Sequence, residues 1–306
     1  MFDILWKVIA PIFVLIGIGT IVQKRVGLDL KTLTRLNFWI FVPAFLFVRI
    51  YESQLSGAQL GKIFLHFCVF FPLLGILTWI FAGLCGFQDR LRRALTASVM
   101  FYNSGNYGIP VAQLAFPGMA LPLQVQAAIV MMQNVSNFTI GLALIAGGRG
   151  KKWSETLLEI FKLPMVYVLV AAWAMRYFHL APPQPLSVAL HWLDSGLVPI
   201  AVVTLGAQMA SLKAPPLSRA LVVSLFLRLI FAPILGFVTV YLLGIRGELG
   251  QALVISTAFP TAVNSALLAL EYDNEPQFAA AAVFYSTLIS SVTVSGVIYA
   301  ASHWMN

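Results

Sequence analysis

The stretch Asn103-Ser-Gly-Asn106-Tyr-Gly108-Ile-Pro110 decides how this chain folds, because it interrupts an otherwise apolar span of about residues 91–116. Glycine permits unusual backbone angles, and proline removes a backbone donor and clashes with the preceding helical turn. Such a break at membrane depth is tolerated only where it is buried in protein or lines a wet cavity. A broken helix also directs free amide groups and a positive half-dipole into the gap. The stretch therefore predicts a site for an anion.

A second apolar span, about residues 249–271, is interrupted in the same way by Ser256-Thr-Ala-Phe-Pro260-Thr-Ala-Val-Asn264-Ser265. Pro110 and Pro260 lie 150 positions apart in a chain of 306 residues. A pair of interrupted spans at matching places in two halves is the best indication that a sequence gives of a transporter's binding site. We therefore expect the two broken helices to cross at a bound solute.

The composition is that of a polytopic helical membrane protein. Hydrophobic residues make up 60% of the chain and charged residues 10%, and the mean hydropathy is +0.89. The long apolar runs lack the period of two that a membrane β-barrel requires. The net charge of +8 does not predict binding to nucleic acid, because the basic residues lie in short loops between spans. Cys68 and Cys85 share one apolar span and predict neither a disulfide framework nor a metal site.

Ten transmembrane spans are predicted, arranged as two halves of five. The first repeat covers residues 1–147, a basic cytoplasmic linker covers 148–156, and the second repeat covers 157–306. Because five is an odd number, a second repeat must be inverted relative to the first. The expected spans are about 2–22, 33–51, 61–86, 91–116, 121–146, 157–178, 193–211, 217–243, 249–271 and 277–302.

The basic residues in the loops predict the orientation. With the N-terminus outside, thirteen Lys and Arg residues fall on the inner face and five on the outer face. This asymmetry satisfies the positive-inside rule. We therefore expect a multi-pass protein of a bacterial inner membrane with its N-terminus outside.

Residues at the two breaks are the predicted substrate-binding residues. Amide and hydroxyl groups there can replace water around a solute without adding net charge. The alternative is a proline kink whose polar groups are satisfied by neighbouring helices. The predicted residues are Asn103, Ser104, Asn106, Gly108, Pro110, Pro260, Thr261 and Asn264.

A further group of polar residues lies in corresponding spans of the two halves and could line the cavity or coordinate an ion. Hydrogen bonds between helices explain each of them equally well. Arg228 lies in the middle of a span and must be paired or line water; it either attracts an anionic solute or binds helix-end carbonyls beside a break. The residues are Gln133, Asn134 and Asn137 in the fifth span, Ser286 and Thr287 in the tenth, and Arg228 in the eighth.

Several absences narrow the function. No Asp or Glu is predicted in the middle of a span, which argues against the carboxylate relay of a sodium–proton antiporter. The sequence has no phosphate-binding Gly-Lys-Ser/Thr loop, no metal-ligand spacing and no Gly-x-Ser-x-Gly elbow. We therefore predict no enzyme activity, catalytic residue, metal site or cofactor. A coupling ion, Na⁺ or H⁺, stays open.

The motifs resemble those of the auxin efflux carrier family, which comprises bacterial organic-acid permeases and plant auxin exporters. The resemblance covers nearly the whole chain and departs where Leu163 precedes Pro164, since the family often has Asn at that place. The motifs are Asn106-Tyr-Gly-Ile-Pro110, Pro199-Ile-Ala-Val-Val-Thr-Leu-Gly206-Ala-Gln208, Phe259-Pro260 and Phe284-Tyr-Ser286-Thr287.

This resemblance implies an all-α fold of two inverted five-helix repeats with crossing broken helices four and nine. Spans one, two, six and seven would form a scaffold that often makes a homodimer. Spans three to five and eight to ten would form a transport domain that moves the solute by an elevator-type shift. Malate, malonate and similar carboxylates, or auxin-like indole acids, would be the solutes, and a related branch couples bile-acid-like solutes to sodium.

We therefore predict a carrier for small organic anions in the lipid bilayer. One alternative is a sodium-coupled symporter that uses the polar residues of the fifth and tenth spans. A membrane receptor or sensor, which would need the breaks only for ligand binding, is the alternative from another class.

Overall fold

The computed structural model describes residues 1–146, 161, 163–212 and 216–304. Within these ranges the regular structure is helical and contains no strand beyond one isolated β-bridge. The predicted linker 148–156 and the start of the predicted sixth span lie outside the described residues.

Seven helical runs in the described part of the chain are long and apolar enough to cross a membrane. They match the predicted first, second, third, fifth, seventh, eighth and tenth spans. The runs are Phe2–Ile4 (α1), Leu5–Ile9 (η1) and Ala10–Val26 (α2); Leu30–Leu36 (α3), Asn37–Phe41 (η2) and Val42–Tyr51 (α4); Gly57–Leu84 (α5); Ala120–Ser136 (α8), Asn137–Gly141 (η4) and Leu142–Ala146 (α9); Gln184–Ser211 (α12); Arg219–Phe226 (α13), Leu227–Phe231 (η5) and Ala232–Leu242 (α14); and Pro276–Trp304 (α17).

The predicted fourth and ninth spans are broken. The fourth comprises Asp89–Met100 (α6), Ser104–Gly108 (η3) and Ile109–Ala115 (α7), and the ninth comprises Gly247–Thr257 (α15) and Val263–Glu271 (α16). The described part of the sixth span contains Pro164–Tyr177 (α11). Ten membrane-crossing helices and an inverted repeat stay predictions.

Four of the helix-embedded prolines directly follow a π-helical turn. Pro11, Pro43, Pro110 and Pro233 each lie two residues after such a turn ends. Proline has no N–H to bond and its ring clashes with the carbonyl four residues earlier. A π turn widens the helix at that place, so the chain continues as a helix instead of stopping.

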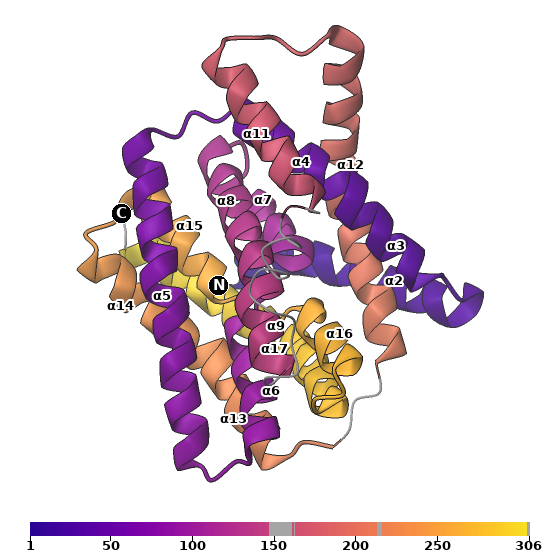
Figure 1. The fold of residues 1–306 in the computed structure, drawn as a ribbon, viewed down its shortest axis with the longest axis vertical. Helices are drawn as coiled ribbons and strands as arrows, with labels where there is room; N and C mark the ends of the chain where they lie inside the picture. The colour runs from indigo at the N-terminus through magenta and orange to yellow at the C-terminus, as the bar shows by residue number, and fades with distance from the viewer. Residues whose placement is uncertain (147–160, 162, 213–215, 305–306) are drawn as a thin grey trace.

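The helices fall into two groups (Figure 1). In one group α12 packs against α2 and α4, and α11 packs along α4. In the other, α5 packs against α6 and α14, while α15 packs against α8, α14 and α17.

The helices α2 and α12 approach each other closely through glycines. A Cβ atom on Gly206 would overlap the carbonyl of Ile16, and one on Gly19 would overlap the carbonyl of Val203. Thr20 Oγ1 donates a hydrogen bond to the Gly206 carbonyl at 3.0 Å. Small residues thus allow this backbone contact, as is common between membrane helices.

One expectation about charge is wrong. Helix α12 begins at Gln184 rather than near residue 193, so Asp194 lies well inside a candidate span. Pro185 permits this early start because proline fits the first helical turn. Asp194 is only 9% exposed, and Arg49 of α4 binds its carboxylate at 2.5 Å. Arg49 thus supplies the opposite charge that a carboxylate inside a candidate span requires.

Candidate functional site

The two breaks pair with each other. The segments around Tyr102 and Thr261 run antiparallel and form the isolated bridge. The N–H of Asn103 donates to the Pro260 carbonyl at 2.7 Å, and the N–H of Ala262 donates to the Phe101 carbonyl at 2.8 Å. Each broken helix therefore satisfies the exposed backbone of the other, as a non-helical segment at membrane depth requires.

The first break lies before Asn103 and not at Pro110. Helix α6 ends at Met100, and the chain resumes as η3 with Asn103 as its N-cap. Asn103 Oδ1 accepts from the Asn106 N–H at 3.1 Å, which is the capping contact that Asn favours. Pro110 lies in the first turn of α7, after the π turn.

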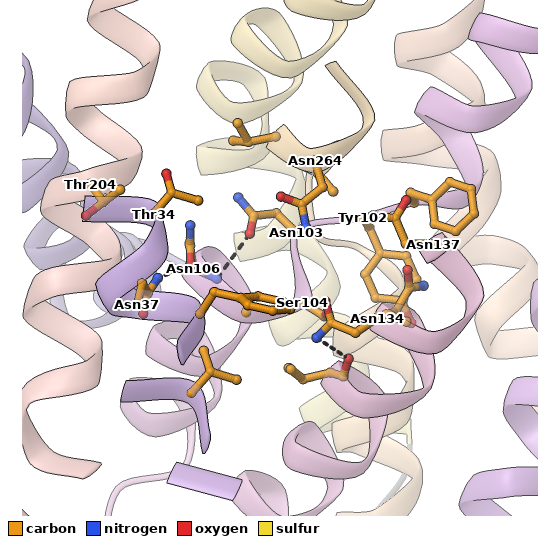
Figure 2. Close-up of a pocket in the computed structure, with 18 of the residues that line it drawn as sticks. Thr34, Asn37, Tyr102, Asn103, Ser104, Asn106, Asn134, Asn137, Thr204 and Asn264 are labelled. Carbon is orange, nitrogen blue, oxygen red and sulfur yellow. Dashed lines mark hydrogen bonds between the residues drawn. The ribbon is translucent and has the colours of Figure 1, made fainter. Parts of the chain in front are cut away.

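Both resumed helices begin at one cavity of about 90 Å³ (Figure 2). Ser104 opens η3 and Val263 opens α16, and both residues line the cavity. None of the described residues that line it is charged. They are Thr34, Asn37, Phe38, Val42, Phe101, Tyr102, Asn103, Ser104, Gly105, Asn106, Val130, Gln133, Asn134, Asn137, Thr204, Gln208, Ala262, Val263 and Asn264.

Unpaired polar atoms gather at this cavity. Six of the lining residues each carry a buried side-chain nitrogen or oxygen without a hydrogen-bond partner in the structure. Each of these six residues is more than nine-tenths buried. Buried polar groups are almost always hydrogen-bonded, so such a concentration indicates a place for water or a ligand. The atoms are Asn37 Oδ1, Asn103 Nδ2, Gln133 Nε2, Asn137 Oδ1, Thr204 Oγ1 and Gln208 Oε1.

The structure brings half of the predicted site residues to the cavity. These are Asn103, Ser104, Asn106, Asn264, Gln133, Asn134 and Asn137. The other seven, Gly108, Pro110, Pro260, Thr261, Ser286, Thr287 and Arg228, are not among the described lining residues.

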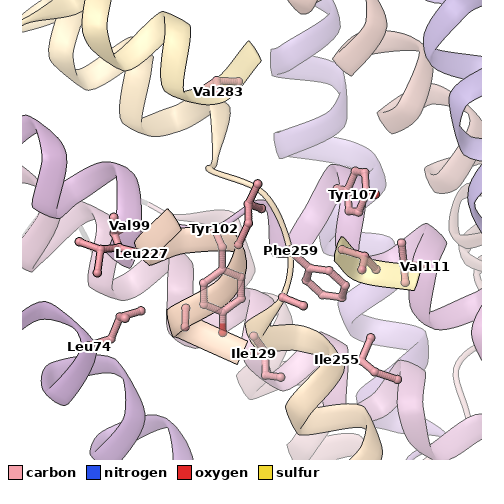
Figure 3. Packing of buried hydrophobic residues seen from close by; sticks show 14 of the residues in the cluster. Leu74, Val99, Tyr102, Tyr107, Val111, Ile129, Leu227, Ile255, Phe259 and Val283 are labelled. Atoms are coloured by element: carbon pink, nitrogen blue, oxygen red, sulfur yellow. The ribbon is translucent and has the colours of Figure 1, made fainter. Parts of the chain in front are cut away.

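Several of these other residues make packing contacts or hydrogen bonds near the place where the broken helices cross. The Thr261 N–H donates to Ser286 Oγ at 3.0 Å, and Thr287 Oγ1 donates to the Val283 carbonyl at 2.7 Å. Gly108 leaves room for the ring of Phe259. That ring packs with Tyr107 and Tyr102 in the apolar core beneath the bridge (Figure 3). These contacts are packing, one hydrogen bond between the second break and α17, and one hydrogen bond within α17.

Arg228 binds helix-end carbonyls, which was one of the two alternatives for it. It is fully buried, and its guanidinium donates to the Val99 carbonyl at 2.6 Å and to the Thr257 carbonyl. These carbonyls belong to the last turns of α6 and α15. The guanidinium also lies 4.9 Å from the centroid of the Tyr102 ring. Arg228 thus joins the C-terminal ends of the half-helices α6 and α15.

The other helical group contributes a cavity wall that was not predicted from the sequence. Asn37 Nδ2 donates to Asn106 Oδ1 at 2.9 Å, and Gln208 Nε2 donates to Thr34 Oγ1 at 3.1 Å. Thr204 also lines this wall. A signal existed for two of these residues, because Asn37 is a polar residue in an apolar span and Gln208 ends the Pro199–Gln208 motif.

The chain is similar in sequence to known membrane transporters. The family model described as membrane transport protein matches residues 154–298. An uncharacterized transporter of Methanothermobacter thermautotrophicus is 26% identical over 298 residues, which cover 94% of this chain and 95% of the relative. A protein of Rhizobium meliloti named "putative malonate transporter" is 23% identical over 308 residues, with 95% and 94% covered. The second half of the chain is therefore similar to the membrane transport protein family, and nearly the whole chain is similar to proteins named as transporters, in keeping with its auxin efflux carrier motifs.

Proposed function

We propose that the protein is a secondary transporter, a carrier, that binds a small organic anion where its two broken helices cross. The observation that carries this proposal is the meeting of two helix N-termini at a cavity with unpaired buried amides. Helix N-termini offer free N–H groups and a positive half-dipole, which together favour an anion. No acidic side chain is among the described lining residues, so nothing there favours a cation by charge.

The cavity size favours a small solute. A volume of about 90 Å³ is well below the roughly 300–1,000 Å³ of pockets for drug-sized ligands. A short carboxylate of the malonate or malate kind therefore suits it better than an indole acid. The name of the Rhizobium meliloti relative points in the same direction.

The two helical groups suggest how the solute would move. We assign α2, α4, α11 and α12 to a scaffold and the helices around α5, α8, α15 and α17 to a transport domain, in keeping with their packing. The contact between Asn37 and Asn106 would then be made and broken in each elevator cycle. The inverted repeats, residues 1–147 and 157–306, the outside N-terminus in a bacterial inner membrane, and a homodimer formed by the scaffold belong to the same proposal.

Sodium coupling is the second candidate. The unpaired oxygens of Asn37, Asn137 and Gln208 are neutral acceptors of the kind that a sodium ion can use. Ser286 and Thr287 of α17 are engaged in hydrogen bonds, which weakens the case for an ion site there. Uptake measured with and without a sodium gradient separates the two candidates.

Counterflow of labelled malonate into proteoliposomes tests the proposal. We expect wild-type protein to exchange the solute and Asn106→Ala to lower the rate at least tenfold, equal to about 1.4 kcal/mol. Ser291→Ala, on α17 and outside the cavity lining, is the control and should keep the wild-type rate. Wild-type rates in a folded Asn106→Ala protein would refute the site. Binding without any counterflow would indicate a receptor instead of a carrier.

A further inference from the structure

Helix ends give the cavity a positive electrostatic character, although none of its described lining residues is charged. A helix N-terminus is equivalent to about +0.5 elementary charge and a C-terminus to about −0.5. Two N-termini face the cavity, that of the continuous helical run 104–115 and that of α16. Together they supply about one positive charge.

Arg228 neutralises the opposite ends of the same broken helices. Its guanidinium donates to the last turns of α6 and α15 through the carbonyls of Val99 and Thr257. Its single positive charge offsets two C-terminal half-charges of about −0.5 each. Within the described residues no acidic side chain pairs with it. The charge of Arg228 therefore balances the helix ends, and the positive charge at the cavity remains for a ligand.

We infer that the cavity binds an organic anion in its singly charged state: a monocarboxylate, or the half-protonated form of a dicarboxylate such as malonate. This inference rests on the proposed function of the site. A fully ionised dicarboxylate would bring a second negative charge against walls whose described residues offer no charged side chain to balance it, which is unfavourable.

Three unpaired amide atoms differ between the two walls of the cavity, while the Thr204 hydroxyl on the second wall can donate or accept. On the side of the broken helices, Asn103 Nδ2 is an unpaired donor beside a helix N-terminus, which suits a carboxylate. On the opposite wall, the amide nitrogens of Asn37 and Gln208 each donate one hydrogen bond, whereas Asn37 Oδ1 and Gln208 Oε1 accept none. An acceptor needs a donor from the solute. A protonated carboxyl or an amide can donate, and a second carboxylate cannot.

The protein itself adds little pH dependence at this place. Tyr102 is the titratable group among the described lining residues, and Arg228 lies over its ring. Neither a phenol nor a guanidinium normally titrates between about pH 5 and 8. A change of anion binding in this range would therefore report the protonation of the solute.

Binding of malonate and of its monoamide, malonamate, to the purified full-length protein tests the inference. Malonamate keeps one negative charge between pH 5 and 8 and presents an amide donor, so its affinity should not change with pH. The affinity for total malonate should rise as the pH falls, approaching tenfold per pH unit above the second pKa of malonate. Succinate and succinamate provide the same comparison for a longer solute.

Three results are decisive. Tight, pH-independent binding of malonate or succinate together with weak binding of the monoamides would show that the dianion binds and would overturn the inference alone. Binding of the monoamides at least as tight as that of the diacids at pH 8 would support it. Failure of all four compounds to bind would overturn the proposed anion site, and the inference with it.

Discussion

Exchange of Asn103 for aspartate tests the sign of the charge that the cavity accepts. Asn103 is 6% exposed, its Oδ1 caps η3 through the Asn106 N–H, and its Nδ2 is an unpaired donor. Aspartate has nearly the same shape and is an equally good N-cap. Asn103→Asp therefore keeps the cap and the fold while it replaces an unpaired donor by a negative charge.

The expected loss of affinity is large. A carboxylate that accepts from Nδ2 would lie about 4 Å from the new charge, and two unit charges at about 4 Å repel by about 4 kcal/mol at an effective dielectric constant of about 20. That energy corresponds to roughly a thousandfold weaker binding. The new carboxylate would also offset the positive end of η3, which leaves the cavity nearly neutral.

The assay is thermal stabilisation of purified protein by malonamate near pH 7, because the melting temperature rises with RT ln(1 + [L]/Kd). Asn103→Ser is the matched control: serine also caps a helix, but it removes only the amide donor, about 0.5–1.5 kcal/mol. We expect the serine variant to bind within about tenfold of wild type, and the aspartate variant to recover binding as falling pH neutralises the new carboxyl. If Asn103→Asp unfolds at the wild-type temperature and binds malonamate within tenfold of wild type near pH 7, the carboxylate does not lie at this end of the cavity.

Three further substitutions test the frame around the cavity. Arg228→Met leaves the Val99 and Thr257 carbonyls without their donor, and each unsatisfied carbonyl costs about 1–3 kcal/mol of stability. The variant should therefore unfold at a clearly lower temperature, and an unchanged melting temperature would contradict the assigned role. Gly206→Ala should destabilise the protein by about 1–3 kcal/mol because α2 must move away from α12, whereas Gly17→Ala, with open space at its Cβ, should not. Equal free energies of unfolding for the two variants in denaturant would refute this. Asn37→Ala removes the unpaired acceptor Oδ1, whose hydrogen bond from the solute is worth about 1 kcal/mol, and should raise the Kd for malonamate roughly fivefold in a titration. An unaltered Kd would place Asn37 outside the binding contacts.

The sequence alone determined the class of the protein and the existence of the breaks. Apolar runs long enough to span a bilayer, and the polar, Gly- and Pro-containing stretches that interrupt two of them, are visible in the sequence itself. The exact place of the first break was not, because the helix ends before Asn103 and continues through Pro110. The polar residues nearest to the breaks, Asn103, Asn106 and Asn264, were predicted on this basis and do line the cavity.

The tertiary structure decided which face of each helix meets the cavity and which distant segment completes it. Arg228 could bind a solute or helix-end carbonyls until packing placed it between Val99 and Thr257. Asn37 and Gln208 lie on helices that are apolar on nearly all sides. The sequence therefore does not show which side of each helix lines the cavity. The bridge between Tyr102 and Thr261 joins residues far apart in the chain, and no local pattern specifies such a contact, because it depends on how whole helices pack.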